Sequence, residues 1–218
     1  MAEKYGEIPP LFTKKWWEYF WDYYKVHTIV VVCMLLAVAI TIYQVSTRVE
    51  YDINVVIGTY SHITDESLAT LRTGIEEHIS DVDNNGEKNA LMVYNGFSDE
   101  VEQGEYSRVL EARFMLNLQE DNSFVFIVDK KSSPLLLNLD YCDEMYLNAE
   151  ELGQAGVDGL KDRNGICYGI PLKESTILKE NNINCDDLYL VLRKNFKEDE
   201  LTKKAFDSSL KLAKELIK

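Results

Sequence analysis

Residues 13–45 read TKKWWEYFWDYYKVHTIVVVCMLLAVAITIYQV, and this stretch decides how the chain is divided. Residues 29–40 contain no polar side chain at any position, whereas a helix in a soluble domain needs a polar face toward solvent. At a rise of about 1.5 Å per residue, residues 26–45 are long enough to cross a hydrocarbon core of roughly 30 Å. The stretch therefore predicts one long transmembrane helix over residues 26–45, followed by a separate domain.

A cleaved signal peptide is the main alternative for such an apolar segment. A signal peptide has a shorter apolar region behind a short basic start, but here 25 residues of aromatic-rich chain come first. Ala37, Val38 and Ala39 imitate a cleavage site, yet they lie inside the apolar run. We therefore expect the segment to remain in place as a signal-anchor.

Aromatic residues gather just ahead of the apolar run. Tryptophan and tyrosine rings settle at the membrane interface, where the ring body contacts acyl chains and the polar edge stays hydrated. Residues 1–25 are therefore expected to form a cytoplasmic and interfacial segment, although an aromatic face that binds a partner protein is an alternative. The aromatic residues are Trp16, Trp17, Tyr19, Phe20, Trp21, Tyr23 and Tyr24.

Basic residues predict the orientation of the span. Lys14, Lys15 and Lys25 precede the apolar run, whereas only Arg48 follows it closely. Because basic residues stay on the cytoplasmic side, the N-terminus is predicted to be cytoplasmic. The chain is then a single-pass protein of the cell membrane, with residues 46–218 as an extracytoplasmic domain.

The C-terminal part carries the whole net charge of the chain. Residues 46–218 contain 19 Lys and Arg against 33 Asp and Glu, and the full chain has a formal net charge of −14. So acidic a surface disfavours nucleic acid and anionic lipid as partners of this part. Its length is that of one ordinary domain with its own core.

Cysteine usage leaves the redox state open. Cys33 lies in the apolar run, so Cys142, Cys167 and Cys185 are left for the C-terminal domain. Three cysteines without close spacing are neither a disulfide framework nor a zinc site. One disulfide among the three and three buried thiols are both compatible with the sequence.

Strand patterns alternate with helix patterns along the C-terminal domain. The strands are rich in β-branched and aromatic residues, and the helices show an apolar stripe. Such alternation predicts an α/β fold with a mostly parallel sheet and helices on both faces. Strands are expected at residues 51–59, 90–96, 123–129, 166–172 and 187–195, and helices at residues 64–80, 100–118 and 198–217.

Residues 137–175 read LNLDYCDEMYLNAEELGQAGVDGLKDRNGICYGIPLKES. This run resembles extracellular solute-binding proteins of sugar-type ABC transporters, in which a helix and a loop precede a YGIPL-like strand, here residues 168–172. The resemblance implies a periplasmic-binding-protein-like lobe; two such lobes would close on a sugar or peptide, and this chain has room for a single one. The whole chain is also similar to a class of uncharacterised single-pass membrane proteins of Gram-positive bacteria.

The turn DVDNNG at residues 81–86 resembles the opening of a calcium-binding loop. In such a loop, alternate side-chain oxygens converge and a glycine permits a sharp turn, as Asp81, Asp83, Asn85 and Gly86 do here. The twelfth position should be a glutamate but is Met92. Asp, Asn and Gly are also ordinary turn residues, so a structural turn is the alternative to a structural calcium site.

Open parallel sheets bind ligands beyond the carboxyl ends of their strands. Tyr60, Ser61 and His62 follow the first predicted strand, and Ser132 and Ser133 follow the third. These five residues are candidate contacts for a polar or hydroxyl-rich ligand. Ordinary loop polarity explains the same residue types.

No pattern in the sequence indicates catalysis. The chain has no nucleophile elbow, phosphate-cradling glycine loop, HExxH helix or dinucleotide fingerprint. We therefore expect a protein that is not an enzyme and needs no cofactor, apart from the calcium considered for the turn.

Two functions from different classes remain. The first expectation is an interaction or assembly domain on a reduced lobe, whose partners are the lipid bilayer and another membrane or envelope protein. The alternative is a membrane-tethered binding module for a small solute or peptide. A hollow lined by convergent polar and aromatic side chains would favour the binding module, and a flat apolar patch would favour the interaction domain.

Overall fold

The structure is a computed structural model, and it describes residues 9–47, 49–98, 105–139 and 141–218. The chain forms two compact units, residues 1–49 and residues 50–218. Arg48, the first eight residues of the predicted cytoplasmic segment and the predicted start of a helix at residue 100 lie outside the described residues.

The first unit is dominated by one helix, α1 (Lys14–Ser46). The Thr13 side chain caps its start by accepting a hydrogen bond from the Trp16 backbone N–H. None of its residues is buried, and it is long and apolar enough to cross a membrane. The aromatic lead and the apolar run belong to this one helix, without a break between them. The helix is thus consistent with a single-pass membrane protein.

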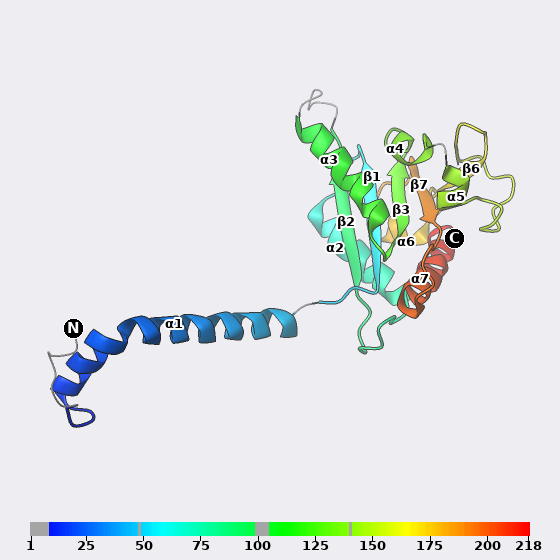
Figure 1. Ribbon diagram of the computed structural model, residues 1–218. Helices are drawn as coiled ribbons and strands as arrows, with labels where there is room; N and C mark the ends of the chain where they lie inside the picture. Colours follow the sequence, from blue (N-terminus) through cyan, green and yellow to red (C-terminus); the bar gives the residue numbers. More distant parts are fainter. Residues whose placement is uncertain (1–8, 48, 99–104, 140) are drawn as a thin grey trace. The chain divides into compact units, whose positions relative to one another are not determined.

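The second unit is an α/β domain around one sheet (Figure 1). Its long helices begin at side-chain caps: Thr64 accepts from the Ser67 N–H and Asp199 from the Thr202 N–H. The elements in chain order are β1 (Ile53–Thr59), α2 (Asp65–His78), β2 (Ala90–Gly96), α3 (Glu105–Leu116), η1 (Asn117–Gln119), β3 (Ser123–Asp129), α4 (Pro134–Leu137), α5 (Cys142–Met145), β4 (Tyr146–Leu147), β5 (Leu160–Lys161), β6 (Cys167–Pro171), α6 (Thr176–Glu180), β7 (Leu188–Arg193) and α7 (Glu200–Leu216).

The sheet is mixed, so the prediction of a mostly parallel sheet is wrong in its second half. Its strand order is β2-β1-β3-β7-β6-β5, and β4 also pairs with β7. Strand β1 is parallel to both β2 and β3, whereas β7 is antiparallel to β3, β4 and β6.

The change of direction coincides with a change in the connecting helices. A parallel neighbour needs a crossover long enough to return across the sheet, usually by a helix. Helices α2 and α3, with 14 and 12 residues, precede the parallel partners β2 and β3. Between β3 and β7 the helices α4, α5 and α6 have only 4 or 5 residues each, and β7 runs antiparallel.

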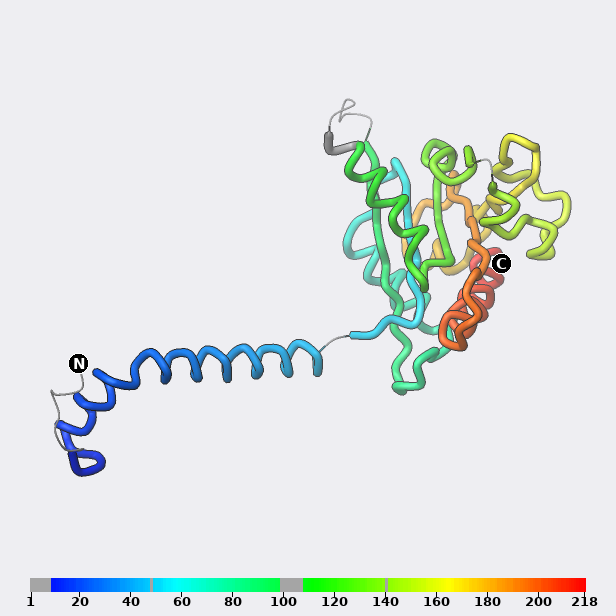
Figure 2. The backbone as a smooth tube through the Cα atoms, viewed as in Figure 1, coloured from blue at the N-terminus to red at the C-terminus, as the bar shows by residue number. Residues whose placement is uncertain are grey.

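Helices cover both faces of the sheet, as predicted (Figures 1 and 2). One hydrophobic cluster joins Ile53, Val55 and Ile57 of β1 to α2 and α7. A second cluster joins Val56, on the opposite face of the same strand, to α3 and α4. Strand β1 is buried along its whole length, so it contributes to the core on both faces of the sheet. The candidate site lies beyond its carboxyl end.

Candidate functional site

The carboxyl ends of β1 and β3 are tied together by a buried carboxylate. Asp129, the last residue of β3, accepts hydrogen bonds from the Thr59 hydroxyl at 2.8 Å and from the Tyr60 backbone N–H at 2.5 Å. Its other oxygen accepts from the Ser132 backbone N–H at 2.7 Å. The Thr59 oxygen in turn accepts from the Ser61 N–H at 2.9 Å. The loop after β1 therefore starts from a fixed position.

Ser132 and Ser133, two of the predicted ligand contacts, lie inside this framework. The Ser132 hydroxyl donates to the Gly58 carbonyl at 2.6 Å, and the Ser133 hydroxyl donates to the Lys130 carbonyl at 2.9 Å. Both residues are buried. Ser132 thus links the turn after β3 to β1, whereas Ser133 bonds within its own turn, and neither residue lines the hollow described next.

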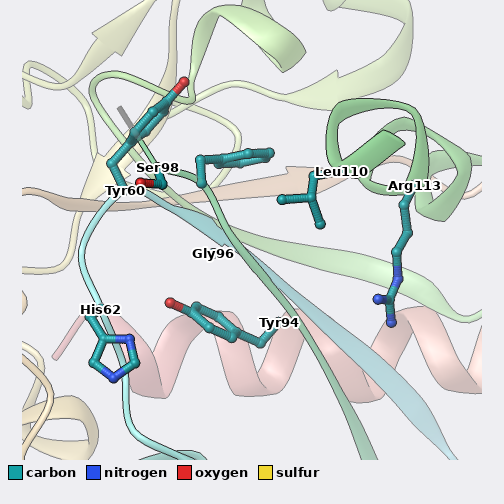
Figure 3. A pocket seen from close by; sticks show the side chains of 8 residues that line it. Tyr60, His62, Tyr94, Gly96, Ser98, Leu110 and Arg113 are labelled. Atoms are coloured by element: carbon teal, nitrogen blue, oxygen red, sulfur yellow. The ribbon is translucent and has the colours of Figure 1, made fainter. Parts of the chain in front are cut away.

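A hollow of about 460 Å³ opens beyond the carboxyl ends of β1 and β2 (Figure 3). This volume lies in the range of small-molecule sites. Of the predicted contacts, Tyr60 and His62 line it, and Ser61 lines a smaller hollow of about 100 Å³ that shares His62. The lining residues are Tyr60, His62, Tyr94, Gly96, Phe97, Ser98, Leu110 and Arg113.

Tyr94 of β2 holds the loop that carries the predicted contacts. Its hydroxyl donates to the Ser61 carbonyl at 3.1 Å and accepts from the Ile63 backbone N–H at 3.3 Å. Figure 3 shows the Tyr94 ring extending toward His62. A Cβ on Gly96 would lie 2.7 Å from the Tyr94 hydroxyl oxygen, so only a glycine at this position leaves room for the Tyr94 side chain as observed. The next strand therefore positions the loop.

Packed rings form the apolar side of the hollow. The rings of Tyr60 and Phe97 have centroids 5.4 Å apart, and Phe97 meets Phe114 edge to face at 5.8 Å. Phe114 packs so closely on β1 that a Cβ on Gly58 would lie 2.5 Å from its ring. This contact explains why a glycine occupies a buried strand at that point.

Two cationic side chains lie at the hollow: Arg113 lines it, and Lys131 lies over the Tyr60 ring. Arg113 of α3 and His62 are both exposed lining residues, and no Asp or Glu occurs among the described residues that line the hollow. The Lys131 ammonium lies 4.2 Å from the centre of the Tyr60 ring. The hollow is thus locally positive within a strongly acidic domain.

Sequence reasoning missed the residues that come from β2 and α3. The sequence patterns place Tyr94 in a strand, Phe97 just after it, and Leu110 and Arg113 in an amphipathic helix, without indicating a site. The parallel pairing of β1 with β2 gives the missing indication, because their carboxyl ends then meet at one edge of the sheet.

Asn95 is an unusual buried residue beside the hollow. It lies between the lining residues Tyr94 and Gly96 and is 1% exposed. Neither its Nδ2 nor its Oδ1 has a hydrogen-bond partner in the part of the chain that the structure describes. A buried amide without partners costs about 1–3 kcal/mol.

The turn considered for calcium lies at the other end of the sheet. Asp81 and Asp83 accept hydrogen bonds from backbone N–H groups of Asn85 and Gly86, and the Asn85 side chain donates to Asp83 at 2.9 Å. Asp52, which the sequence analysis did not select, joins them: one oxygen from each of the three carboxylates lies within 4.8 Å of the others. The Asp52 oxygens accept from the backbone N–H groups of Val82 and Asn89.

The two turn carboxyl groups differ in pKa. Desolvation raises the pKa of Asp81, but hydrogen bonds, first of all from the Gly86 N–H, outweigh it and leave the pKa below its ordinary value. Desolvation also raises the pKa of Asp83, and the negative charges of Asp52 and Asp81 raise it further, against a bond from Asn85. The backbone hydrogen bonds occur in either interpretation of the turn, and the close carboxylates repel one another when no cation lies between them.

The four cysteines are all free thiols. Cys142 and Cys185 are buried, and Cys167 is half-buried. Burial raises the pKa of the Cys142 and Cys167 thiols above the ordinary value, so these groups are protonated at neutral pH. The sequence left open one disulfide or three free thiols in this domain, and the structure has three free thiols.

Comparison with protein-family models, with curated proteins and with solved structures returns no match to this chain.

Proposed function

We propose that the C-terminal domain is a membrane-tethered module that binds a small polar solute or a short peptide. The observation that carries the proposal is the hollow beyond β1 and β2, where aromatic rings and convergent polar groups meet. Such a combination is typical of small-molecule sites. The binding module is thereby favoured over the interaction domain that the sequence alone put first.

The proposed role is binding without chemistry. A nucleophile needs a base within hydrogen-bond reach, and among the described residues His62, the histidine that lines the hollow, makes no hydrogen bond to a serine, threonine or cysteine. The serines after β3 donate their hydroxyl protons to backbone carbonyls. The described residues therefore support recognition of a ligand by stacking and charge.

Helix α1 is proposed to anchor the module in the cell membrane. Its apolar length and its lack of any buried residue support a membrane span, and its aromatic lead supports an interface. The lysines ahead of the span support a cytoplasmic N-terminus and an extracellular C-terminal domain. The lipid bilayer is then the first partner of the chain.

Calorimetric titration of the full-length chain in nanodiscs tests the binding role. The ligands are neutral sugars, amino acids, dipeptides and small organic acids, each class titrated separately. We expect one class to bind, and we expect His62→Ala and Gly96→Ala to weaken that binding by about fivefold or more, because a lost contact of about 1 kcal/mol has this effect. Gly96→Ala acts by pushing on the Tyr94 hydroxyl.

The matched control is His78→Ala on α2. His78 lies outside the hollow, with its Nδ1 atom 2.9 Å from the Gly74 carbonyl oxygen. The control should bind like the unchanged protein. If no class of ligand binds, or if both histidine variants weaken binding equally, the hollow is not a binding site.

An interaction or assembly domain remains a second candidate because α3 exposes two apolar side chains. Val109 and Leu116 are 60% and 59% exposed and lie seven residues apart, which places them on one side of the helix. Cross-linking in intact membranes tests this candidate. A partner that is lost on Val109→Asp and Leu116→Asp together, but retained in His62→Ala, would support it.

A further inference from the structure

We propose that the ligand of the hollow is a small organic carboxylate that carries a ring with an apolar face, held by the guanidinium of Arg113. This inference rests on the proposed binding function and names its ligand class. An aromatic acid and an acidic sugar both have this chemistry.

Arg113 is the first reason. It lines the hollow, and its side chain takes part in none of the ion pairs found among the described residues, although carboxylates far outnumber basic groups in this domain. Arg72 on α2, by contrast, pairs with Glu76 at 2.8 Å. An arginine left without a carboxylate at the wall of a hollow is placed to bind one from a ligand.

A second cation adds positive charge beside the hollow. The Lys131 ammonium lies over the Tyr60 ring, and His62 supplies a polar group on the side of the hollow away from Arg113 in Figure 3. No carboxylate among the described lining residues opposes them. The local field therefore favours an anion, against the field of the whole acidic domain.

The aromatic side chains limit the shape of the ligand. Tyr60, Tyr94 and Phe97 line the hollow together with Leu110. Flat apolar surfaces of this kind contact the face of an aromatic ring or the C–H face of a sugar ring. A guanidinium fork matches a planar carboxylate with two parallel hydrogen bonds. A carboxylate attached to a ring with an apolar face contacts both the aromatic side chains and the guanidinium.

Paired probes that differ only in charge test the ligand class. Full-length protein in nanodiscs is titrated with benzoate against benzamide, and with glucuronate against glucose. We expect the charged member of at least one pair to bind about tenfold more tightly than its neutral partner, the effect of one charge-assisted contact. The pair that shows the preference separates the aromatic acid from the acidic sugar.

Arg113→Gln should abolish the preference for charge and leave both members of the pair with similar weak affinity. Arg108→Gln is the matched control, because Arg108 is an exposed arginine on the same helix outside the hollow. Equal binding of charged and neutral members, or equal effects of the two variants, would overturn the carboxylate inference and leave the binding function standing. No binding by any probe or by the wider ligand panel would overturn both.

Discussion

The Thr59 hydroxyl donates a 2.8 Å hydrogen bond to a carboxylate oxygen of Asp129, 70 residues further along the chain. Both residues are buried, at the last positions of β1 and β3. The contact fixes the ends of two neighbouring parallel strands at the same level. Since the loop with Tyr60 and His62 begins at this point, the walls of the hollow depend on it.

Asp129→Asn should destabilise the domain by about 1–3 kcal/mol. Three donors converge on the two carboxylate oxygens, and an amide offers only one oxygen, so at least one buried N–H or O–H loses its acceptor. Urea unfolding of residues 50–218, which contain both hydrophobic clusters, measures the loss.

Thr59→Ser is the control for this network, because it keeps the hydroxyl and removes one buried methyl group. A loss of about 1 kcal/mol or less is expected. If Asp129→Asn costs no more than Thr59→Ser, the carboxylate is not what holds the strand ends.

Asn95→Leu should stabilise the domain, by about 1–2 kcal/mol. The substitution removes a buried amide whose two polar atoms are unpartnered among the described residues, and it adds an apolar side chain of similar size. Thermal and urea unfolding both report the gain.

Asn54→Leu provides the matched comparison. Asn54 is also buried in a strand, but its Nδ2 donates to the Ser123 hydroxyl at 3.1 Å. This variant should be destabilising, since it leaves the serine without its partner. Equal losses in the two leucine variants would mean that Asn95 has a partner in solution.

Arg193→Met should destabilise the domain by about 2–4 kcal/mol. The buried guanidinium donates to the backbone carbonyls of Leu118, Glu120 and Asp121, and its central carbon lies 5.0 Å from the centre of the Phe124 ring. Removing the donors takes away the guanidinium partner of the buried Leu118 carbonyl and the links to the exposed residues Glu120 and Asp121.

Lys197→Met is the control that separates the loss of the buried Arg193 hydrogen bonds from the loss of a surface charge. Lys197 pairs with Asp121 at 2.6 Å, but both side chains are more than half exposed, so a loss below about 1 kcal/mol is expected. Similar losses in both variants would contradict a special role for the buried arginine.

Asp83→Asn should raise the unfolding temperature slightly at neutral pH, on the order of 1 °C. Because the folded-state pKa of Asp83 is raised, its stabilising contribution is full below the ordinary carboxyl pKa and is lost as pH rises through the raised value. The difference between variant and unchanged protein should therefore shrink toward acid pH. Scanning calorimetry across the acidic range measures it.

Calcium added in the same scans separates the two interpretations of the turn. A structural calcium site predicts a rise in unfolding temperature for the unchanged protein and none for Asp83→Asn. A turn without calcium predicts no rise in either protein. A lower unfolding temperature for Asp83→Asn without calcium would mean that the bonds to Asn85 outweigh the repulsion.

The elements with strong periodicity were predictable from the sequence, and the sheet direction was not. The three parallel strands and the helices α2 and α7 lie where the alternation of patterns predicted them, and Thr64 and Asp199 cap the two helices. Residues 187–195 were recognised as a strand, but nothing in the side chains of a strand buried on both faces encodes its direction. The antiparallel direction of β7 relative to β3 accompanies the short helices α4, α5 and α6 that precede it.

Of the residues that line the candidate site, only those in the loop after β1 were predictable from the sequence. Tyr60 and His62 follow β1 directly, so the rule for carboxyl ends found them. Ser132 follows β3 equally directly, yet its hydroxyl serves the backbone of β1. Arg113 faces the hollow because of how α3 packs, and packing of one helix against a sheet edge cannot be read from its own sequence.

Helix α7 also determines when the domain can become folded during its synthesis. It follows every strand in sequence, yet Leu212 and Leu216 complete the cluster that begins with Ile53 of β1. Helix α2 covers only part of this face of the first strands, so the cluster stays incomplete until α7 leaves the ribosome, and domains generally fold as units. For the extracytoplasmic domain proposed above, late completion of the core by α7 would keep the polypeptide unfolded while it crosses the membrane.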